Sequence, residues 1–149
     1  QRKYSGMLLS SSVIRSRLAD GTLGITPFAE DSLQPASYDL RCAEDTVLRK
    51  GELSLIPSME VISLPADLAA TLWGRSSFGR KGVLLCAGYI DPGFRGNLTL
   101  CMVNMGSEDI PVAKGTRIIQ MLIHPVLGDV ETAYNGQYQD SHGVVTSKL

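Results

Sequence analysis

Short apolar runs separated by turns make up most of the chain after Pro35. Several runs alternate apolar and polar residues with a period of two, as in YDLRC at 38–42 and NLTLCMV at 97–103. Segments rich in glycine and proline, such as DPGFRG at 91–96, lie between the runs. Many short strands joined by such turns are typical of a sandwich or barrel and not of alternating strands and helices. The pattern therefore predicts an all-β fold.

Two short helices are predicted beside the strands. The first covers residues 10–20, where Val13, Ile14 and Leu18 fall on one face. Ser10 or Ser11 can cap its start, and the glycine at position 21 can end it in the left-handed conformation. The second is a single helical turn in SSFGRKG at 76–82, wedged between two strands.

The 149 residues suit one domain, which we place at 7–133. Residues 134–149 are polar and poorly periodic, so we expect them to form a mobile C-terminal tail. We interpret residues 1–6 as the remnant of an expression tag, with Met7 as the native start.

Charge and cysteine content narrow the classes of function. The chain has 14 basic and 15 acidic residues and a net charge of −1, which argues against a protein that coats nucleic acid or binds membranes through basic residues. No run approaches the roughly 18 apolar residues of a membrane span. The three cysteines, Cys42, Cys86 and Cys101, lack CxxC spacing, which argues against a disulfide framework or a zinc site and favours a reducing cytoplasm.

A basic, hydroxyl-rich cluster is the first candidate site: Arg75, Ser76, Ser77 and Arg80. Backbone N–H groups at a helix start favour anions, and guanidinium groups match phosphate oxygens. The same residues also fit a helix cap flanked by two surface arginines. Their spacing leaves both interpretations open.

Asp91 leads into a turn in which Pro92 and Gly93 can take the two central positions of type II. A carboxylate aimed by such a turn can orient or deprotonate a water molecule. It can equally cap its own turn. Phe94 is either a core residue or a platform for a flat ring. Asp39, inside a strand pattern, is either a solvent-facing residue or a group that holds a metal through water.

Four segments together resemble the dUTPase and dCTP deaminase superfamily: ASYDL (36–40), GRSSFGRKG (74–82), AGYIDPGFRG (87–96) with VN after it, and KGTRIIQ (114–120). The resemblance begins near Met7 and covers nearly the whole chain. It implies a distorted β-barrel or jelly-roll fold. It also implies a homotrimer with active sites between subunits, a deoxyribonucleoside triphosphate as ligand, and Mg²⁺.

The resemblance also implies a role for individual residues. Asp91 positions or activates the water, and Asp39 is linked to magnesium through water. Phe94 lies against the deoxyribose, and a C-terminal tail closes over the site. The triphosphate would be held by Arg75, Ser76, Ser77, Arg80, Gln120, Tyr134 and Tyr138. The pyrimidine would be read by Cys86, Ala87, Gly88, Tyr89 and Ile90.

The superfamily contains two chemistries, and Cys101 bears on the choice. In dCTP deaminases a glutamate stands at the aligned position and activates water for attack on cytosine C4. A thiol has an ordinary pKa near 8.5, which is poorly matched to that task at pH 7. We therefore expect a magnesium-dependent dUTP diphosphatase built on the dCTP deaminase branch, which forms dUMP and pyrophosphate.

Two alternatives remain open. One is a dCTP deaminase, or a bifunctional deaminase and diphosphatase, because the tail YNGQYQDSHGVVTS (134–147) resembles that branch. The other is a catalytically silent homologue that binds nucleotide or a protein partner. Gln137 stands where the branch commonly has a phosphate-binding lysine, and this favours the silent homologue.

Overall fold

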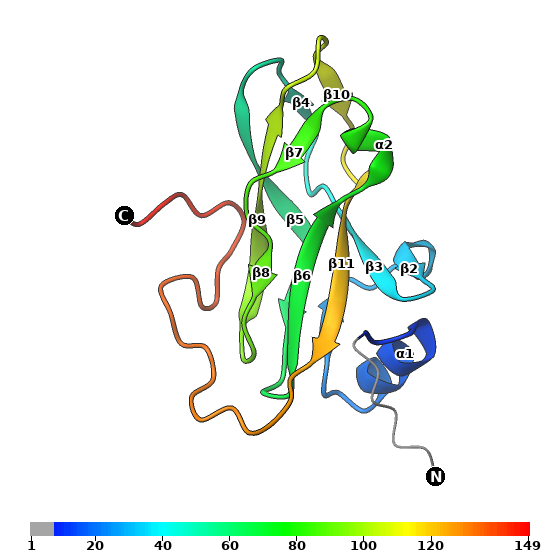
Figure 1. The fold of residues 1–149 in the computed structure, drawn as a ribbon, viewed down its shortest axis with the longest axis vertical. Coiled ribbons are helices and arrows are strands. Elements are labelled where there is room, and N and C mark those ends of the chain that lie inside the picture. The colour runs from blue at the N-terminus through cyan, green and yellow to red at the C-terminus, as the bar shows by residue number, and fades with distance from the viewer. Residues whose placement is uncertain (1–7) are drawn as a thin grey trace.

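The computed structural model describes residues 8–149. The segment interpreted as a tag remnant, residues 1–6, lies outside the described residues. Figure 1 shows strands through the body of the molecule, with α1 beside its lower end and the C-terminal segment along the opposite side. The elements are α1 (Ser11–Ala19), β1 (Gly24–Thr26), η1 (Glu30–Ser32), β2 (Leu33–Gln34), β3 (Ser37–Arg41), β4 (Thr46–Leu48), β5 (Leu53–Ser63), β6 (Leu68–Gly74), α2 (Ser76–Gly79), β7 (Val83–Leu85), β8 (Tyr89–Ile90), β9 (Arg95–Asn104), β10 (Ile110–Val112) and β11 (Arg117–Pro125).

The strands pair antiparallel in three sheets. A five-stranded sheet has the order β2-β3-β11-β6-β8, and a four-stranded sheet has the order β1-β5-β9-β7. Strands β10 and β4 form a small third sheet. The sheets of the described residues remain separate and do not close into one barrel, so the fold is the distorted jelly-roll form of the prediction. The all-β prediction is confirmed.

One apolar core joins the two larger sheets. Alternate residues of each strand face inward, such as Leu100 and Met102 on β9 and Ile119 and Met121 on β11. These side chains belong to a single buried cluster. Burial of apolar surface on both inner faces holds the two layers together.

Both predicted helices are present. Helix α1 begins after Ser10, whose side chain accepts a hydrogen bond from the backbone N–H of Val13. It ends before Gly21, which has a φ of 78°. Ile14 is buried, whereas Val13 is exposed, so the predicted apolar face is narrower than the sequence pattern suggested. Helix α2 is a single turn of four residues.

Residues 139–145 run beside β9 and are hydrogen-bonded to it, whereas the sequence predicts a mobile tail there. Asn97 donates its backbone N–H to the carbonyl of Ser141, and Val145 donates to the hydroxyl of Thr99. Strand β7 pairs only with residues 102–104 of β9, so the edge at 96–99 is free to accept this segment. Their polar groups satisfy a sheet edge, and the sequence periodicity does not reveal that role.

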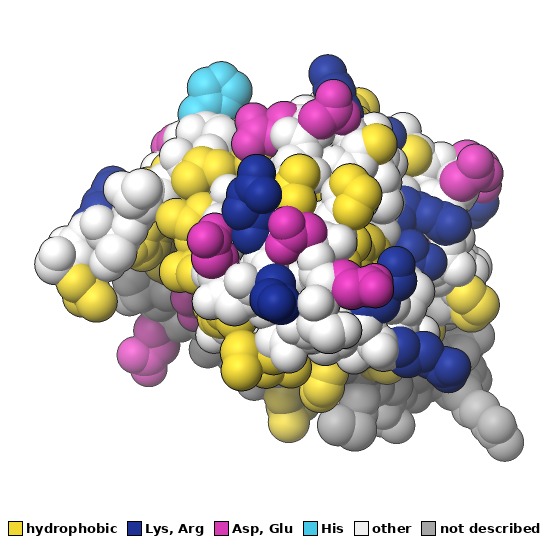
Figure 2. All heavy atoms as spheres, turned by 90° about the horizontal axis from the view of Figure 1, so that it is seen from above, with side chains coloured by type: hydrophobic (Ala, Val, Ile, Leu, Met, Phe, Trp, Pro, Cys, Tyr) yellow, Lys and Arg dark blue, Asp and Glu magenta, His cyan; other side chains and the backbone are white. Residues whose placement is uncertain are grey.

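Charges of both signs are mixed over the end of the molecule seen in Figure 2, with no single basic face there. Among the described residues, no helix is long and apolar enough to cross a membrane.

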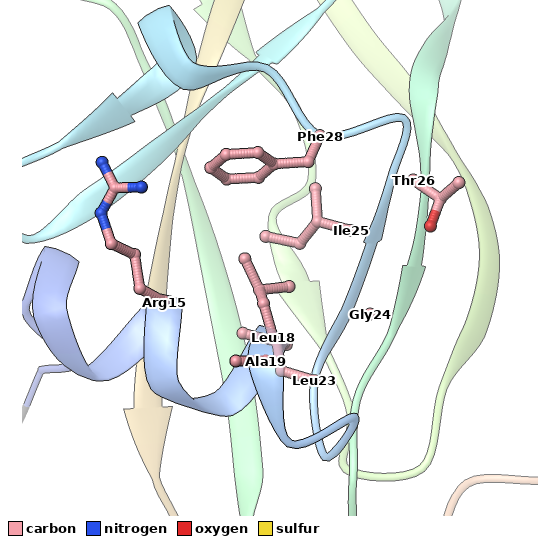
Figure 3. A pocket seen from close by; sticks show the side chains of 8 residues that line it. All are labelled: Arg15, Leu18, Ala19, Leu23, Gly24, Ile25, Thr26 and Phe28. Atoms are coloured by element: carbon pink, nitrogen blue, oxygen red, sulfur yellow. The ribbon is translucent and has the colours of Figure 1, made fainter.

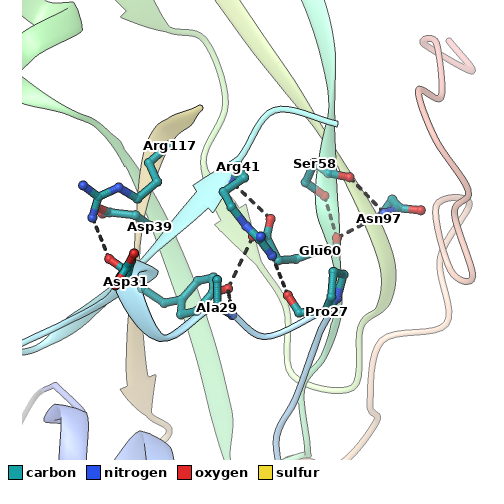
Figure 4. A network of polar contacts seen from close by, with 10 residues as sticks. Pro27, Ala29, Asp31, Asp39, Arg41, Ser58, Glu60, Asn97 and Arg117 are labelled. Carbon is teal, nitrogen blue, oxygen red and sulfur yellow. Dashed lines mark hydrogen bonds and ion pairs between the residues drawn. The ribbon is translucent and has the colours of Figure 1, made fainter. Parts of the chain in front are cut away.

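A buried ion pair lies at the edge of the core (Figure 4). The carboxylate of Glu60 on β5 is fully buried and accepts hydrogen bonds from the side chain of Arg41, at 2.7 Å, and from the Arg41 backbone N–H, at 3.0 Å. The Tyr38 hydroxyl donates to it at 3.4 Å. The second guanidinium arm of Arg41 donates to the carbonyl of Pro27. The pair therefore ties β3 to β5 and to the segment before η1.

A second buried carboxylate, Asp39 on β3, lies between two arginines. Its Oδ2 atom is 3.4 Å from Nε of Arg75 and 3.7 Å from Nη1 of Arg117. Burial raises the pKa of the Asp39 carboxyl above its ordinary value, and the charges of Arg75 and Arg117 oppose this shift only in part. The ionised form of Asp39 is thus less favourable in the folded chain than in the unfolded one.

Arg41→Ala should lower the free energy of unfolding by about 3 kcal/mol or more, because it leaves Glu60 buried without its cation. Urea denaturation would measure this. The control is Arg15→Ala, which removes the exposed ion pair with Glu30 and should cost far less stability, because water screens an exposed pair. Equal losses in the two variants would contradict a special role for the buried pair.

Asp39→Asn should change how stability depends on pH. Because the folded pKa of Asp39 is raised, the folded chain binds more protons than the unfolded chain between the two pKa values. The parent protein should therefore lose stability as pH rises through this acidic window, and the variant should lose less. Asp67 is the control, because its hydrogen bond with Arg17 lowers its pKa in the folded chain. Asp67 therefore stabilises the folded chain increasingly as pH rises through its acidic window, and Asp67→Asn should remove this increase. Denaturation at a series of pH values tests both slopes, and parallel curves for Asp39→Asn and its parent would contradict the assignment.

Candidate active site

A polar cavity of about 450 Å³ opens where β3, β11 and the end of β6 meet. It brings together four of the predicted site residues: Asp39, Arg75, Ser76 and Gln120. These come from three of the four segments that carry the family resemblance. The other lining residues are Leu8, Gln34, Pro35, Ala36, Ser37 and Leu122.

Strand pairing positions Gln120 in this cavity. In β11 it lies opposite Asp39 on one side and opposite Trp73 on the other. Its side-chain amide donates to the hydroxyl of Ser37 at 3.1 Å. Neighbouring residues Ile119 and Met121 are buried, because alternate residues of a strand point to opposite faces. Because the neighbouring residues of β11 point into the core, the side chain of Gln120 points to the outer face of the sheet.

Arg117 is a residue that sequence reasoning missed. It forms an ion pair with Asp39, and its backbone carbonyl accepts a hydrogen bond from Arg75 at 2.9 Å. Two guanidinium groups against one carboxylate give this corner a net positive charge. Arg117 belongs to the motif KGTRIIQ and stands three positions before Gln120, but the spacing alone does not show where its side chain points.

The predicted link between Asp39 and magnesium does not fit these contacts. Its carboxylate is 3% exposed and faces two guanidinium groups, so it has little capacity left for a cation. The described residues contain no group of three or more His, Cys, Asp or Glu side chains that could hold a metal ion.

Two members of the predicted phosphate cluster lie elsewhere. Ser77 is exposed on α2 and does not line the cavity. Arg80 lines a different cavity with Lys81, Gly82 and Gly106. Helix α2 is only four residues long, so its dipole adds little to anion binding. The structure therefore places Arg75 and Ser76 in the cavity without Ser77 and Arg80.

The turn at Asp91 has the geometry that the sequence predicts. Phe94 donates its backbone N–H to the carbonyl of Asp91 at 3.1 Å, and Gly93 has a φ of 87°. These are the features of a type II turn. The Asp91 side chain is exposed at the start of the turn. Phe94 is 7% exposed and packs against Tyr134 with ring centroids 5.7 Å apart, so it is a core residue in this chain.

The segment predicted to read the base lies between β7 and the Asp91 turn. Cys86 and Ala87 are exposed, and Tyr89 is 63% exposed on β8. Ile90 is buried and belongs to the core. A side chain at Gly88 would lie 2.7 Å from the carbonyl oxygen of residue 72, so only glycine fits there. Backbone groups of this turn are thus held close to β6.

The structure does not bring Asp91 to the cavity. Ala70 lies opposite Ile90, so Asp91 comes opposite Ala69 at the far end of β6. Arg75 follows the end of β6 and is six residues from Ala69. At about 3.3 Å per extended residue, Arg75 and Asp91 are therefore separated by about 20 Å. One chain therefore carries the two halves of the predicted site at opposite ends of β6.

The two tail tyrosines lie with the Asp91 half. Tyr134 packs on Phe94, and its hydroxyl accepts a hydrogen bond from the backbone N–H of Tyr138. The Nζ atom of Lys148 lies 5.6 Å from the ring centroid of Tyr138. Neither tyrosine lines the cavity that holds Arg75.

Cys101 is half-buried on β9, opposite Leu55 of β5. Its thiol donates a weak hydrogen bond to the carbonyl of Thr99 at 3.7 Å. Burial raises the pKa of the Cys101 thiol, with a smaller contribution from Cys86. The thiol is therefore neutral near pH 7 and is not a base.

A second, more apolar cavity lies between α1 and β1 (Figure 3). Leu18, Leu23, Ile25 and Phe28 point into it, with Arg15 at its side. It contains none of the predicted site residues.

Comparison with known proteins identifies the family. Residues 42–126 match the model of the dCTP deaminase-like family. The chain is 34% identical to dCTP deaminase of Pyrococcus furiosus over 95% of this chain and 97% of that protein. It is also 34% identical to "dCTP deaminase, dUMP-forming" of Rhodococcus opacus, over 95% and 96%.

Solved structures share the fold. The 2'-deoxycytidine 5'-triphosphate deaminase of Agrobacterium tumefaciens matches with a TM-score of 0.70 and 24% identity over 80% of this chain. The match spans about half of that longer chain, 48%. EIAV dUTPase matches with a TM-score of 0.58 and 23% identity, over 76% of this chain and 92% of that one.

These findings correct the expectation of a dUTP diphosphatase. Cys101 suggested that activity, but curated relatives that span nearly the whole chain are named dCTP deaminases. The prediction of the superfamily, with the chain on its dCTP deaminase-like branch, is confirmed, whereas the prediction of dUTP diphosphatase activity is wrong. Cys101 alone indicated the diphosphatase activity, whereas similarity along nearly the entire sequence identifies the family. The chain belongs to the dCTP deaminase-like family.

Proposed function

We propose that this protein acts on dCTP, replacing the 4-amino group of the cytosine with oxygen from water to give dUTP and ammonia. The observation that carries the proposal is the 34% identity to dCTP deaminase of Pyrococcus furiosus across 95% of this chain and 97% of that protein. The family relationship supports dCTP as the substrate, and the polar cavity is the proposed binding site for its triphosphate.

The triphosphate is assigned to the cavity of Arg75, Ser76 and Gln120. The guanidinium groups of Arg75, which lines the cavity, and of Arg117 both face the single Asp39 carboxylate, so this corner is positive although the whole chain carries a net charge of −1. A local positive field attracts an anionic ligand. Guanidinium and hydroxyl groups are suited to phosphate oxygens. Mg²⁺ would be held by phosphate oxygens of the bound triphosphate, and it would offset part of their negative charge.

A complete site requires a second copy of the chain. The cavity and the Asp91 turn are about 20 Å apart along β6, too far to contact the same reacting atoms. In a homotrimer the turn of one copy could lie against the cavity of the next. Exposed apolar side chains on the outer sheet faces, Leu53, Trp73 and Leu84, offer surface for such packing.

Cys101 favours a second candidate function, in which the protein binds dCTP without deaminating it. Attack of water on cytosine requires a group that removes a proton from the water and delivers it to the base. A thiol whose pKa is raised by burial can donate a proton but does not remove one at pH 7. The two candidates share the ligand and differ in turnover.

Incubation with dCTP should yield uracil nucleotide and ammonia, measured by chromatography and an ammonia assay. Cys101→Glu should raise the rate by about 100-fold or more, since a positioned general acid–base group contributes that much. Cys101→Ser is the control and should not raise it. Binding of dCTP without product, together with a gain in the glutamate variant, would favour the second candidate. A chain that neither binds nor converts dCTP would refute both.

Mixing two defective variants should restore activity if sites are shared between copies. One variant carries Ser76→Ala and Gln120→Ala, and the other carries Asp91→Asn. After random reassembly about a quarter of the sites should combine an intact cavity with an intact turn from the neighbouring copy. Product formation, or bound dCTP if turnover is absent, measures the recovery. Mixtures no better than the separate variants would contradict a shared site.

A further inference from the structure

Cys86 and Cys101 face each other where β7 meets β9. Leu84 is paired with Val103 and Leu85 with Met102, so the next step of the ladder places Cys86 opposite Cys101. The backbone N–H of Cys86 donates to the carbonyl of Cys101 at 2.8 Å. The two cysteines, 15 positions apart in the sequence, are therefore direct neighbours across the sheet.

Their side chains lie on the same, outer face of the sheet. Met102 is buried and Cys101 is half-buried, as the alternation along a strand requires. Directly opposite residues of an antiparallel pair project to one side. The contribution of Cys86 to the raised pKa of the Cys101 thiol agrees with this proximity.

The spacing suits a bond between the two sulfur atoms. Directly opposite residues of an antiparallel pair have Cα atoms about 4.5–5.5 Å apart, inside the range of about 4.4–6.8 Å found for disulfides. Their Cβ atoms, about 4.5–5.5 Å apart, would have to approach by about 0.7–1.7 Å to reach the mean disulfide separation of about 3.8 Å. Cys86 follows the last residue of β7 in an exposed turn, so its backbone can supply that movement. A bond formed with some strain is easily reduced.

We propose that Cys86 and Cys101 form a reversible intrachain disulfide by exchange with a low-molecular-weight disulfide such as oxidised glutathione. The exposed Cys86 loses its proton and attacks one sulfur of glutathione disulfide, which releases one glutathione. Cys101 then loses its proton and attacks the Cys86 sulfur of the mixed disulfide, which releases the second glutathione. The protein gains one disulfide as two thiols are oxidised, and one glutathione disulfide is reduced.

The surroundings assign the order of these steps. Cys86 is accessible to a small disulfide, whereas Cys101 is half-buried behind it. The third cysteine, Cys42, is fully buried, and its thiol donates to the carbonyl of Glu44 at 2.8 Å. Cys42 therefore takes no part. The bond would tie the turn after Cys86 to β9, and its formation does not depend on which nucleotide the protein binds.

The test treats dilute protein with oxidised glutathione and counts free thiols after unfolding, with intact and peptide mass spectrometry. In the parent chain the count should fall from three to one, with Cys86 linked to Cys101, and a dithiol reductant should restore it. Cys101→Ser should stop with one glutathione attached to Cys86. Cys86→Ser should keep its thiols free. Cys42→Ser is the matched control and should still lose two thiols.

Several outcomes would overturn the proposal. They are a parent chain that stops at the mixed disulfide, a bond between separate chains, and equal modification of the Cys86→Ser variant. A Cys42→Ser variant that lost only one thiol would also overturn it, because Cys42 would then be one of the partners.

Discussion

The register of β11 between β3 and β6 is the constraint on which the cavity depends. Gln120 is aligned with Asp39 on one side and with Trp73 on the other, so one strand fixes both walls. A shift by one residue would turn Gln120 into the core and Ile119 outward. The buried face of β11 opposes such a shift, because it would expose apolar side chains. The apolar core thus positions polar groups that it does not contact.

The same register divides the site. Arg75 of the cavity follows the end of β6, whereas β8 pairs with β6 near its start, so the Asp91 turn lies far from the cavity. A strand is stiff and extended, and one chain cannot fold it back to join the two halves. This is the physical argument for a site shared between copies.

Charge in the interior follows a consistent pattern. Glu60 and Asp39 are both buried, and each faces arginine. Glu60 has close contacts that tie strands together. Asp39 has longer contacts with Arg75 and Arg117, and its pKa is raised by burial. Two guanidinium groups beside one carboxylate suit an anionic ligand in the adjoining cavity better than a metal ion.

The sequence by itself determined the local features. Strand content, the two short helices and the Pro92–Gly93 turn depend on neighbouring residues, and all are present in the structure. The motifs also indicated the correct superfamily. They also indicated its dCTP deaminase-like branch, but the diphosphatase activity inferred from a single position, Cys101, was wrong.

Tertiary structure decided what lies next to what. It separated Arg80 from Arg75, joined Arg117 to Asp39, and buried Phe94 under Tyr134. It also laid the polar residues after 138 along the free edge of β9 and set Cys86 opposite Cys101. These contacts join residues far apart in the chain, and periodicity and turn chemistry report only on near neighbours. Strand order and register, which the packing of the whole core selects, supply the rest.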